Sequence, residues 1–141
     1  MAYELEQTAK YPGGLVDSEF REIRTARNDT GALIPFGIVV GLLADSTCRP
    51  WTTGDYVFGI SAFEQKVGDG YGDNEECGIA RKATIYTLVG GAASVAVGDT
   101  AYVLDGGTVT NDDGSGANPV VGVFLGVGQP DEYVAVQINL P

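Results

Sequence analysis

The sequence predicts an all-β fold: a small β-barrel or β-sandwich, jelly-roll-like, with an extended N-terminal arm. Short runs rich in Val, Ile, Tyr and Phe recur after Leu33, and 21 Gly residues help to separate them. Branched and aromatic side chains favour strands, whereas Gly, Asp and Asn favour turns. The composition, 44% hydrophobic and 19% charged over 141 residues, fits one globular domain. We expect the arm over residues 1–30 and the β domain over residues 31–141.

The arm is polar and carries three arginines at regular spacing. Arg21, Arg24 and Arg27 recur at every third position. On a helix they would share one face, whereas on an extended segment they would alternate between two sides. The sequence leaves both conformations open. In either one, the arm is typical of a segment that packs on a partner or on a neighbouring subunit.

Seven segments after the arm have the length and composition of strands. Gly, Pro, Asp or Asn bound each of them, and the last partly alternates between apolar and polar residues, which predicts one buried face. Seven short strands at this spacing are typical of a barrel or a sandwich. The segments are 36–43, 56–62, 79–89, 100–104, 108–110, 119–126 and 132–139.

The turns between these strands are explicit. Asp105-Gly106-Gly107 has the composition of a hairpin turn between the fourth and fifth segments. Gly54-Asp55 and Gly98-Asp99 each precede a strand and look alike. Two occurrences are too few to define a repeat. The polar run 111–116 is predicted to be an exposed loop, and no linker divides the β domain.

The charge distribution limits the classes of partner. The net charge is −11, so we expect no nucleic acid and no membrane partner. No apolar run approaches the roughly 20 residues that span a bilayer. All eight basic residues lie at or before Lys82, and only acidic charges follow. Either the N-terminal side faces a partner and the C-terminal part faces solvent, or the clustering is chance.

The chain lacks the residues that most reaction centres use. It contains no His, which removes the commonest general base and metal ligand. The acidic stretch around Asp69 and Glu76 does not follow the order of a known Ca²⁺ loop, so a solvated loop is the preferred interpretation. Cys48 and Cys77 are expected to be free thiols in a reducing compartment. We therefore expect no enzyme activity, no catalytic residue, no metal and no cofactor.

Several short motifs occur along the chain in a fixed order. The first is Tyr11-Pro12-Gly13-Gly14-Leu15-Val16-Asp17-Ser18, and the most recognisable is Ile34-Pro35-Phe36-Gly37 followed by an apolar strand. The others lie at 57–61, 80–86, 97–103, 121–125 and 135–139. Together, over about residues 11–140, they resemble the structural cement, or capsid decoration, proteins of tailed bacteriophages. The chain departs from the pattern at Ala83, where the family usually has Gly, and in its acidic stretch 68–77.

The resemblance implies a structural role rather than catalysis. Such a protein binds the outer surface of the phage capsid and stabilises contacts between major capsid protein capsomers. It also associates with itself, as a trimer or, less favoured, a dimer. It would be made in the bacterial host cytoplasm and would lie on the outer capsid surface of the virion. The alternative is a virion β-module that binds glycans or cell surfaces.

Two groups of residues are the candidate contacts under this interpretation. The capsid-contact group belongs to the arm, where arginine can pair with carboxylates of the capsid protein in two-bond geometry. The alternative without a capsid contact is that these arginines are solvated or pair internally with Glu19 and Glu22. Large aromatic side chains are the expected anchors between subunits. The capsid-contact residues are Tyr11, Pro12, Arg21, Arg24 and Arg27, and the subunit-interface residues are Phe36 and Trp51.

Overall fold

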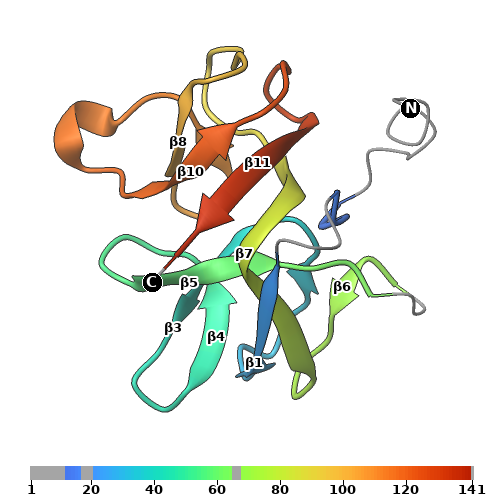
Figure 1. Cartoon of the computed structure of the whole chain (residues 1–141). Helices are drawn as coiled ribbons and strands as arrows, with labels where there is room; N and C mark the ends of the chain where they lie inside the picture. The colour runs from blue at the N-terminus through green and yellow to red at the C-terminus, as the bar shows by residue number, and fades with distance from the viewer. Residues whose placement is uncertain (1–11, 17–20, 65–67, 141) are drawn as a thin grey trace.

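The structure is a computed structural model that describes residues 12–16, 21–64 and 68–140. These residues form strands and connecting turns, with one short 3₁₀ segment, so the all-β prediction is confirmed (Figure 1). The elements are β1 (Glu22–Asn28), β2 (Ile34–Pro35), β3 (Val39–Leu42), β4 (Thr47–Pro50), β5 (Tyr56–Ser61), β6 (Gly70–Tyr71), β7 (Glu76–Leu88), β8 (Thr100–Val103), β9 (Val109–Thr110), η1 (Gly114–Gly116), β10 (Val120–Phe124) and β11 (Tyr133–Asn139).

The first half of the chain closes into a barrel. The strands follow the order β1-β4-β3-β5-β7, and β1 pairs again with β7, which closes the ring. The β1–β4 pairing is parallel and the other four are antiparallel. We call this ring the first barrel. Closure matters because it removes most of the unpaired strand edges that would otherwise invite aggregation.

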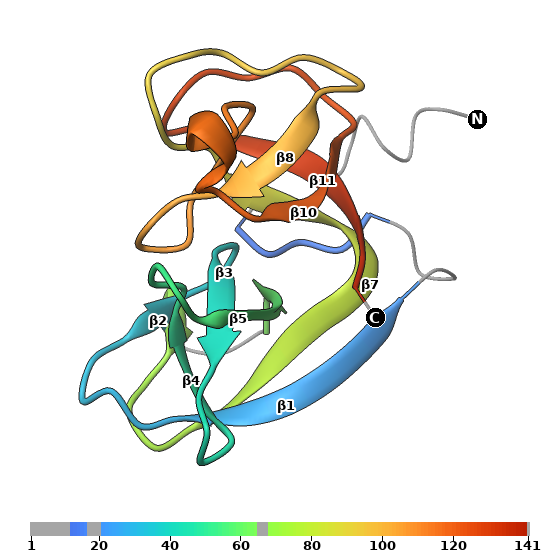
Figure 2. The same cartoon turned by 90° about the vertical axis from the view of Figure 1, so that its left-hand side faces the viewer.

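The second half of the chain forms a second lobe on the same sheet. Its strands follow the order β7-β11-β10-β8-β9, and all neighbours are antiparallel. A single parallel bridge between Val89 and Val109 brings β9 back beside the segment that leaves β7. The second lobe is therefore also ring-like, although only one bridge completes it. Figure 2 shows the two lobes one above the other.

β7 belongs to both lobes and joins them. Its first part pairs with β1 and β5, and its second part pairs with β11 from Lys82 to Leu88. Each lobe has its own hydrophobic core. Because successive side chains of a strand point to opposite faces, Val39 packs into the core of the second lobe while Val40 packs into that of the first barrel. Residues of one strand thus stabilise both lobes.

The predicted arm contributes a strand to the first barrel. β1 lies within the segment expected as an arm over residues 1–30, and its Ala26 and Asn28 are buried. The Asn28 side-chain amide donates hydrogen bonds to the carbonyl oxygens of Ala32, Tyr71 and Gly72 at 2.7, 3.0 and 3.1 Å. These bonds tie the end of β1 to the loop before β2 and to the turn after β6, so this part of the chain is anchored.

The two cysteines are free and buried in the core of the first barrel. Cys48 on β4 and Cys77 on β7 lie on either side of β1, paired with its residues Asn28 and Ala26. Hydrogen bonding with Cys48, together with burial, raises the pKa of the Cys77 thiol. A protonated, buried thiol is a poor nucleophile, so Cys77 serves packing. Among the described residues, no helix is long and apolar enough to span a membrane.

Candidate functional site

The segment that contains Pro12 is held against β7. Its Gly13 N–H donates to the Tyr86 carbonyl oxygen at 2.9 Å, and the Tyr86 N–H donates to Gly14 at 2.9 Å. The Val16 N–H donates to the Thr84 carbonyl oxygen at 2.8 Å. Gly13 has a φ of +69°, and a Cβ there would lie 2.6 Å from the Ser61 carbonyl oxygen. Close backbone packing therefore requires glycine at position 13, and the hydrogen bonds to β7 fix the place of the neighbouring Pro12.

Pro12 opens onto a pocket with aromatic walls. The pocket has a volume of about 260 Å³ and lies between the N-terminal segment, the small β2–β6 sheet and the start of β11. The Phe36 ring meets the rings of Phe63 and Tyr71 edge-on, with centroids 5.4 and 5.1 Å apart. We call it the aromatic pocket, and its side-chain lining is Pro12, Pro35, Phe36, Phe63, Asp69 and Tyr133.

One carboxylate, that of Asp69, stands in the wall of the aromatic pocket. Asp69 is exposed, and its side chain makes no hydrogen bond or ion pair with another described residue. Its backbone carbonyl accepts a hydrogen bond from the Phe36 N–H at 3.1 Å, which positions the loop. Burial, and then the charge of Asp69, raise the pKa of the Tyr133 phenol. The pocket is therefore apolar on most sides and negative on one.

The arginines of the predicted capsid contact are not among the lining residues of this pocket. Arg24 and Arg27 stand on β1 and Arg21 directly precedes it, and all three are exposed. Because the segment is a strand, residues an odd number of positions apart point to opposite sides, so Arg24 faces away from Arg27. The Arg24 Nε lies 3.1 Å from a Glu22 carboxylate oxygen. The extended alternative is the one found for Arg24 and Arg27. Among the described residues Arg24 has an internal partner, Glu22, whereas the other expected partner, Glu19, lies outside the described residues.

The predicted interface aromatics are both buried within the chain. Phe36 and Trp51 are each 2% exposed. Phe36 belongs to the core of the first barrel and Trp51 to that of the second lobe, so the structure separates them. Only Phe36 joins Pro12, in the wall of the aromatic pocket. Tyr11 lies outside the described residues. The capsid and interface roles of these residues stay predictions.

Trp51 directly follows β4, at the start of a turn that connects the first barrel to the second lobe. Its indole N–H donates to the Asp55 carbonyl oxygen at 2.9 Å. The Asp55 carboxylate accepts hydrogen bonds from Arg49 Nε at 2.9 Å and Nη2 at 2.8 Å. The Arg49 guanidinium thereby holds the pKa of the Asp55 carboxyl below its usual range. This pair fixes the shape of the turn.

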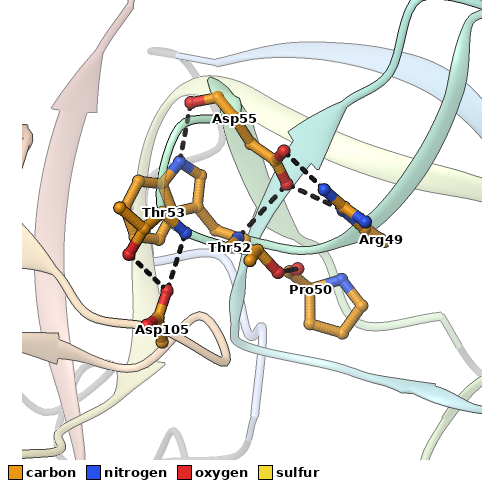
Figure 3. A network of polar contacts seen from close by, with 7 residues as sticks. Arg49, Pro50, Thr52, Thr53, Asp55 and Asp105 are labelled. Carbon is orange, nitrogen blue, oxygen red and sulfur yellow. Dashed lines mark hydrogen bonds and ion pairs between the residues drawn. The ribbon is translucent and has the colours of Figure 1, made fainter.

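The tip of the same turn binds the β8–β9 hairpin. The backbone N–H and the hydroxyl of Thr53 both donate to an Asp105 carboxylate oxygen at 2.7 Å, as Figure 3 shows. The Gly106 N–H donates to the Trp51 carbonyl oxygen at 2.8 Å. These bonds hold the pKa of the Asp105 carboxyl below its usual range. We call this set of contacts the hairpin latch, and it keeps the two lobes in one orientation.

The second lobe carries exposed apolar side chains that sequence reasoning missed. Val97 and Val127 are each 65% exposed, and Val120 is 58% exposed. They lie on β10, on the segment after it and just before β8, where the bridge between Val95 and Gly128 brings these segments together. Exposed apolar side chains gathered in one region are candidates for a contact surface. We call this group the β10 surface: Val97, Val120, Val123, Leu125 and Val127.

Comparison with known proteins gives the family. Residues 1–139 match the family described as "Structural cement protein (E217 gp24/Pam3 gp6)". A solved structure titled "The capsid of Myoviridae Phage XM1" contains a chain with the same fold, at a TM-score of 0.74. That chain is 16% identical, and the alignment covers 94% of this chain and 93% of that one. No curated protein sequence matches significantly. The match over nearly the whole length, on an all-β fold shared with a phage capsid chain, shows that this chain belongs to the structural cement protein family.

Proposed function

We propose that this protein binds the outer surface of a phage capsid and stabilises contacts between the capsomers of the major capsid protein. The observation that carries the proposal is the family match, because it extends over residues 1–139 and includes the N-terminal segment. Many copies on a closed shell would reinforce one another, so each contact can be weak. The acidic second lobe, which faces solvent in this proposal, would keep particles apart.

β1 is the best candidate for the shell contact. It is paired with β7 over its length, but β4 joins it only at Arg27 and Asn28. The backbone of residues 22–26 therefore has an edge that β4 leaves uncovered, and such an edge can accept a strand from a partner. Ile23, at 40% exposure, and the exposed arginines lie beside it. An edge flanked by positive charge suits a partner segment that carries carboxylates.

Self-association, which we expect as a trimer, would use the β10 surface. Its exposed valines and leucine lie on the lobe opposite β1, so subunit contacts there would leave β1 free. Replacement of Leu125, which is 43% exposed, by Asp should give monomers in sedimentation velocity while the fold is kept. An unchanged oligomer would place the subunit contact elsewhere.

An add-back experiment tests the shell binding. The purified protein is mixed with mature and with immature shells that lack it, and the mixtures are sedimented on a gradient. Stoichiometric co-sedimentation with mature shells supports cementing, and a higher melting temperature of the decorated shell supports stabilisation. Absence of binding to either shell would overturn the proposal. Glycan binding by the isolated protein would then favour the alternative of a surface-binding module.

Substitutions on β1 locate the contact. Arg24→Gln and Arg27→Gln should each weaken shell binding and reduce its salt dependence, because a charge at an interface rim acts mainly through electrostatic attraction. Glu22→Gln is the matched control, since it frees Arg24 from its internal partner without removing a positive charge. Weakening by Glu22→Gln as strong as by Arg24→Gln would mean that the pair supports the strand and does not contact the shell.

A further inference from the structure

The aromatic pocket has the composition of a receptor for one cationic side chain. Rings of Phe36, Phe63 and Tyr133 and two prolines form its walls, and among the described lining residues Asp69 is the one that carries a charge. The face of an aromatic ring attracts cations, and a nearby carboxylate adds to that attraction. None of the described lining residues is basic. Both features favour the same kind of occupant, a positively charged one.

We propose that this pocket receives an arginine side chain of the shell protein, with the guanidinium against the rings and paired to Asp69. The inference rests on the proposed function and names the chemistry of one contact within it. Arginine suits the pocket better than lysine because its planar, weakly hydrated guanidinium stacks on aromatic rings and pairs with a carboxylate through two bonds. In this contact the shell protein supplies the arginine and this chain supplies the carboxylate. At β1 the roles are reversed, because this chain supplies the arginines.

Size favours a side chain over a small molecule. The volume of about 260 Å³ lies below the range of roughly 300–1,000 Å³ that ligand and cofactor pockets occupy. The net charge of −11 would attract a basic partner over longer distances. A pocket that admits one side chain and attracts its charge is typical of an anchor point in a protein interface.

Two walls of the pocket, Phe36 and Pro12, are held in place by contacts within the chain. Phe36 is 2% exposed and is held between Phe63 and Tyr71, at interplanar angles of 61° and 87°. Pro12 is held by the hydrogen bonds of its neighbours Gly13 and Gly14 to β7. A preformed site loses little side-chain freedom on binding, so even one side chain gains useful affinity there.

A titration followed by nuclear magnetic resonance tests the pocket on the full chain. The probe is N-acetyl-arginine amide, and the matched neutral probe is the citrulline analogue. We expect saturable shifts of the Tyr133 and Phe63 ring signals and of the Asp69 amide with the arginine probe, and at least a fivefold weaker response with citrulline. Asp69→Asn should weaken arginine binding by about fivefold or more. Asp112→Asn is the control, since it removes the same charge from the exposed loop after β9.

The outcomes separate this inference from the proposed function. Equal responses to arginine and citrulline, or no effect of Asp69→Asn, would overturn the arginine pocket. A stronger response to N-acetyl-lysine amide than to the arginine probe would also overturn the arginine pocket, in favour of a lysine partner. In the add-back experiment, Asp69→Asn and Phe63→Leu should bind shells more weakly than Asp112→Asn. If the unmodified protein binds shells and these variants bind equally well, the pocket inference fails while the proposed function stands. If the unmodified protein binds no shell, the proposed function fails and the arginine contact with it.

Discussion

Replacement of Gly107 by Ala should weaken the contact between the two lobes and so lower the free energy of unfolding. Gly106→Ala is the matched control. Both glycines lie in the β8–β9 hairpin with nearly equal positive φ, +91° at Gly107 and +92° at Gly106. A Cβ on Gly107 would lie 2.4 Å from the Val39 carbonyl oxygen, whereas a Cβ on Gly106 meets nothing within 4 Å. Both substitutions therefore place a Cβ at a positive φ, and they differ in whether that Cβ meets the first barrel.

The size of the difference follows from these contacts. A left-handed conformation costs a residue with a Cβ about 1–2 kcal/mol, and the stiffer unfolded chain of Ala offsets up to about 1 kcal/mol of this. Gly106→Ala should thus destabilise the protein by roughly 1 kcal/mol or less. At Gly107 the overlap adds about 1–3 kcal/mol, and the 2.8 Å hydrogen bond from the Val39 N–H to the Gly107 carbonyl adds about 1 kcal/mol if it breaks. We expect Gly107→Ala to cost about 3 kcal/mol.

Urea denaturation followed by tryptophan fluorescence measures both variants. Trp51 is the sole Trp of the chain, and its carbonyl accepts a hydrogen bond from Gly106, so the signal reports on the hairpin latch itself. Gly107→Ala should lower the midpoint clearly more than Gly106→Ala, and its melting temperature should fall by about 10 °C at roughly 3 °C per kcal/mol. Equal effects of the two substitutions would refute the reasoning, since they would show that strain alone matters and that the contact with Val39 does not.

Two further predictions concern the response to pH. Burial raises the pKa of Tyr71 to about 12, and its hydroxyl donates to the Ala62 carbonyl oxygen at 2.7 Å. Tyr71 therefore ionises at lower pH in the unfolded chain than in the folded one, so the free energy of unfolding should fall as pH rises from about 10 towards 12. Tyr71→Phe should reduce this loss of stability at alkaline pH, measured by urea denaturation at each pH. The same substitution should cost about 1 kcal/mol at pH 7, because the hydrogen bond is lost. The pKa of Asp55 is lowered by its hydrogen bonds with Arg49, so its contribution is present above about pH 4 and is lost as pH falls through the folded-state pKa. Asp55→Asn should make the acid limb shallower, and a limb as steep as that of the unmodified protein would exclude Asp55 as a source of acid sensitivity.

The strands of the second lobe could be predicted because their signals are local. The turn Asp105-Gly106-Gly107 joins β8 to β9 as its composition indicates, and β11 alternates between buried and exposed residues as predicted. The two Gly-Asp pairs also form matching turns. The Asp55 and Asp99 N–H groups donate to the carbonyl oxygens of Thr52 and Ala96 at 2.9 and 3.1 Å. Their carboxylates accept hydrogen bonds from the same two residues at 3.2 and 2.9 Å.

Two strands of the first barrel escaped prediction because long-range pairing decides them. β1 has the sequence Glu-Ile-Arg-Thr-Ala-Arg-Asn and buries only Ala26 and Asn28, so its pattern does not alternate clearly. β4 is Thr-Cys-Arg-Pro and ends in a residue that strands usually avoid. β7 begins at Glu76 rather than at the predicted residue 79, because its first residues pair with β1.

The aromatic pocket could not be predicted from spacing. Its described lining comes from segments that are far apart in the sequence, at residues 12, 35–36, 63, 68–69 and 133. The Pro-Gly-Gly run indicated a turn but not the backbone packing that places Pro12 there. The sequence favours a solvated loop for the acidic stretch 68–77, and nothing local distinguishes Asp69 from its acidic neighbours. Only the tertiary fold brings one of these carboxylates to a set of aromatic rings.

The continuity of β7 has a mechanical consequence. The strand passes without interruption from the first barrel into the second lobe, with β1 and β5 bonded along its first part and β11 along its second. Hydrogen bonds between antiparallel strands lie perpendicular to the strand axis. A force that pulls the two lobes apart along β7 therefore acts in shear on its hydrogen bonds with β1, β5 and β11. All the bonds with one neighbouring strand bear this force together, and they do not break one after another. The molecule therefore resists extension most strongly along the axis of β7, the longest of the described strands.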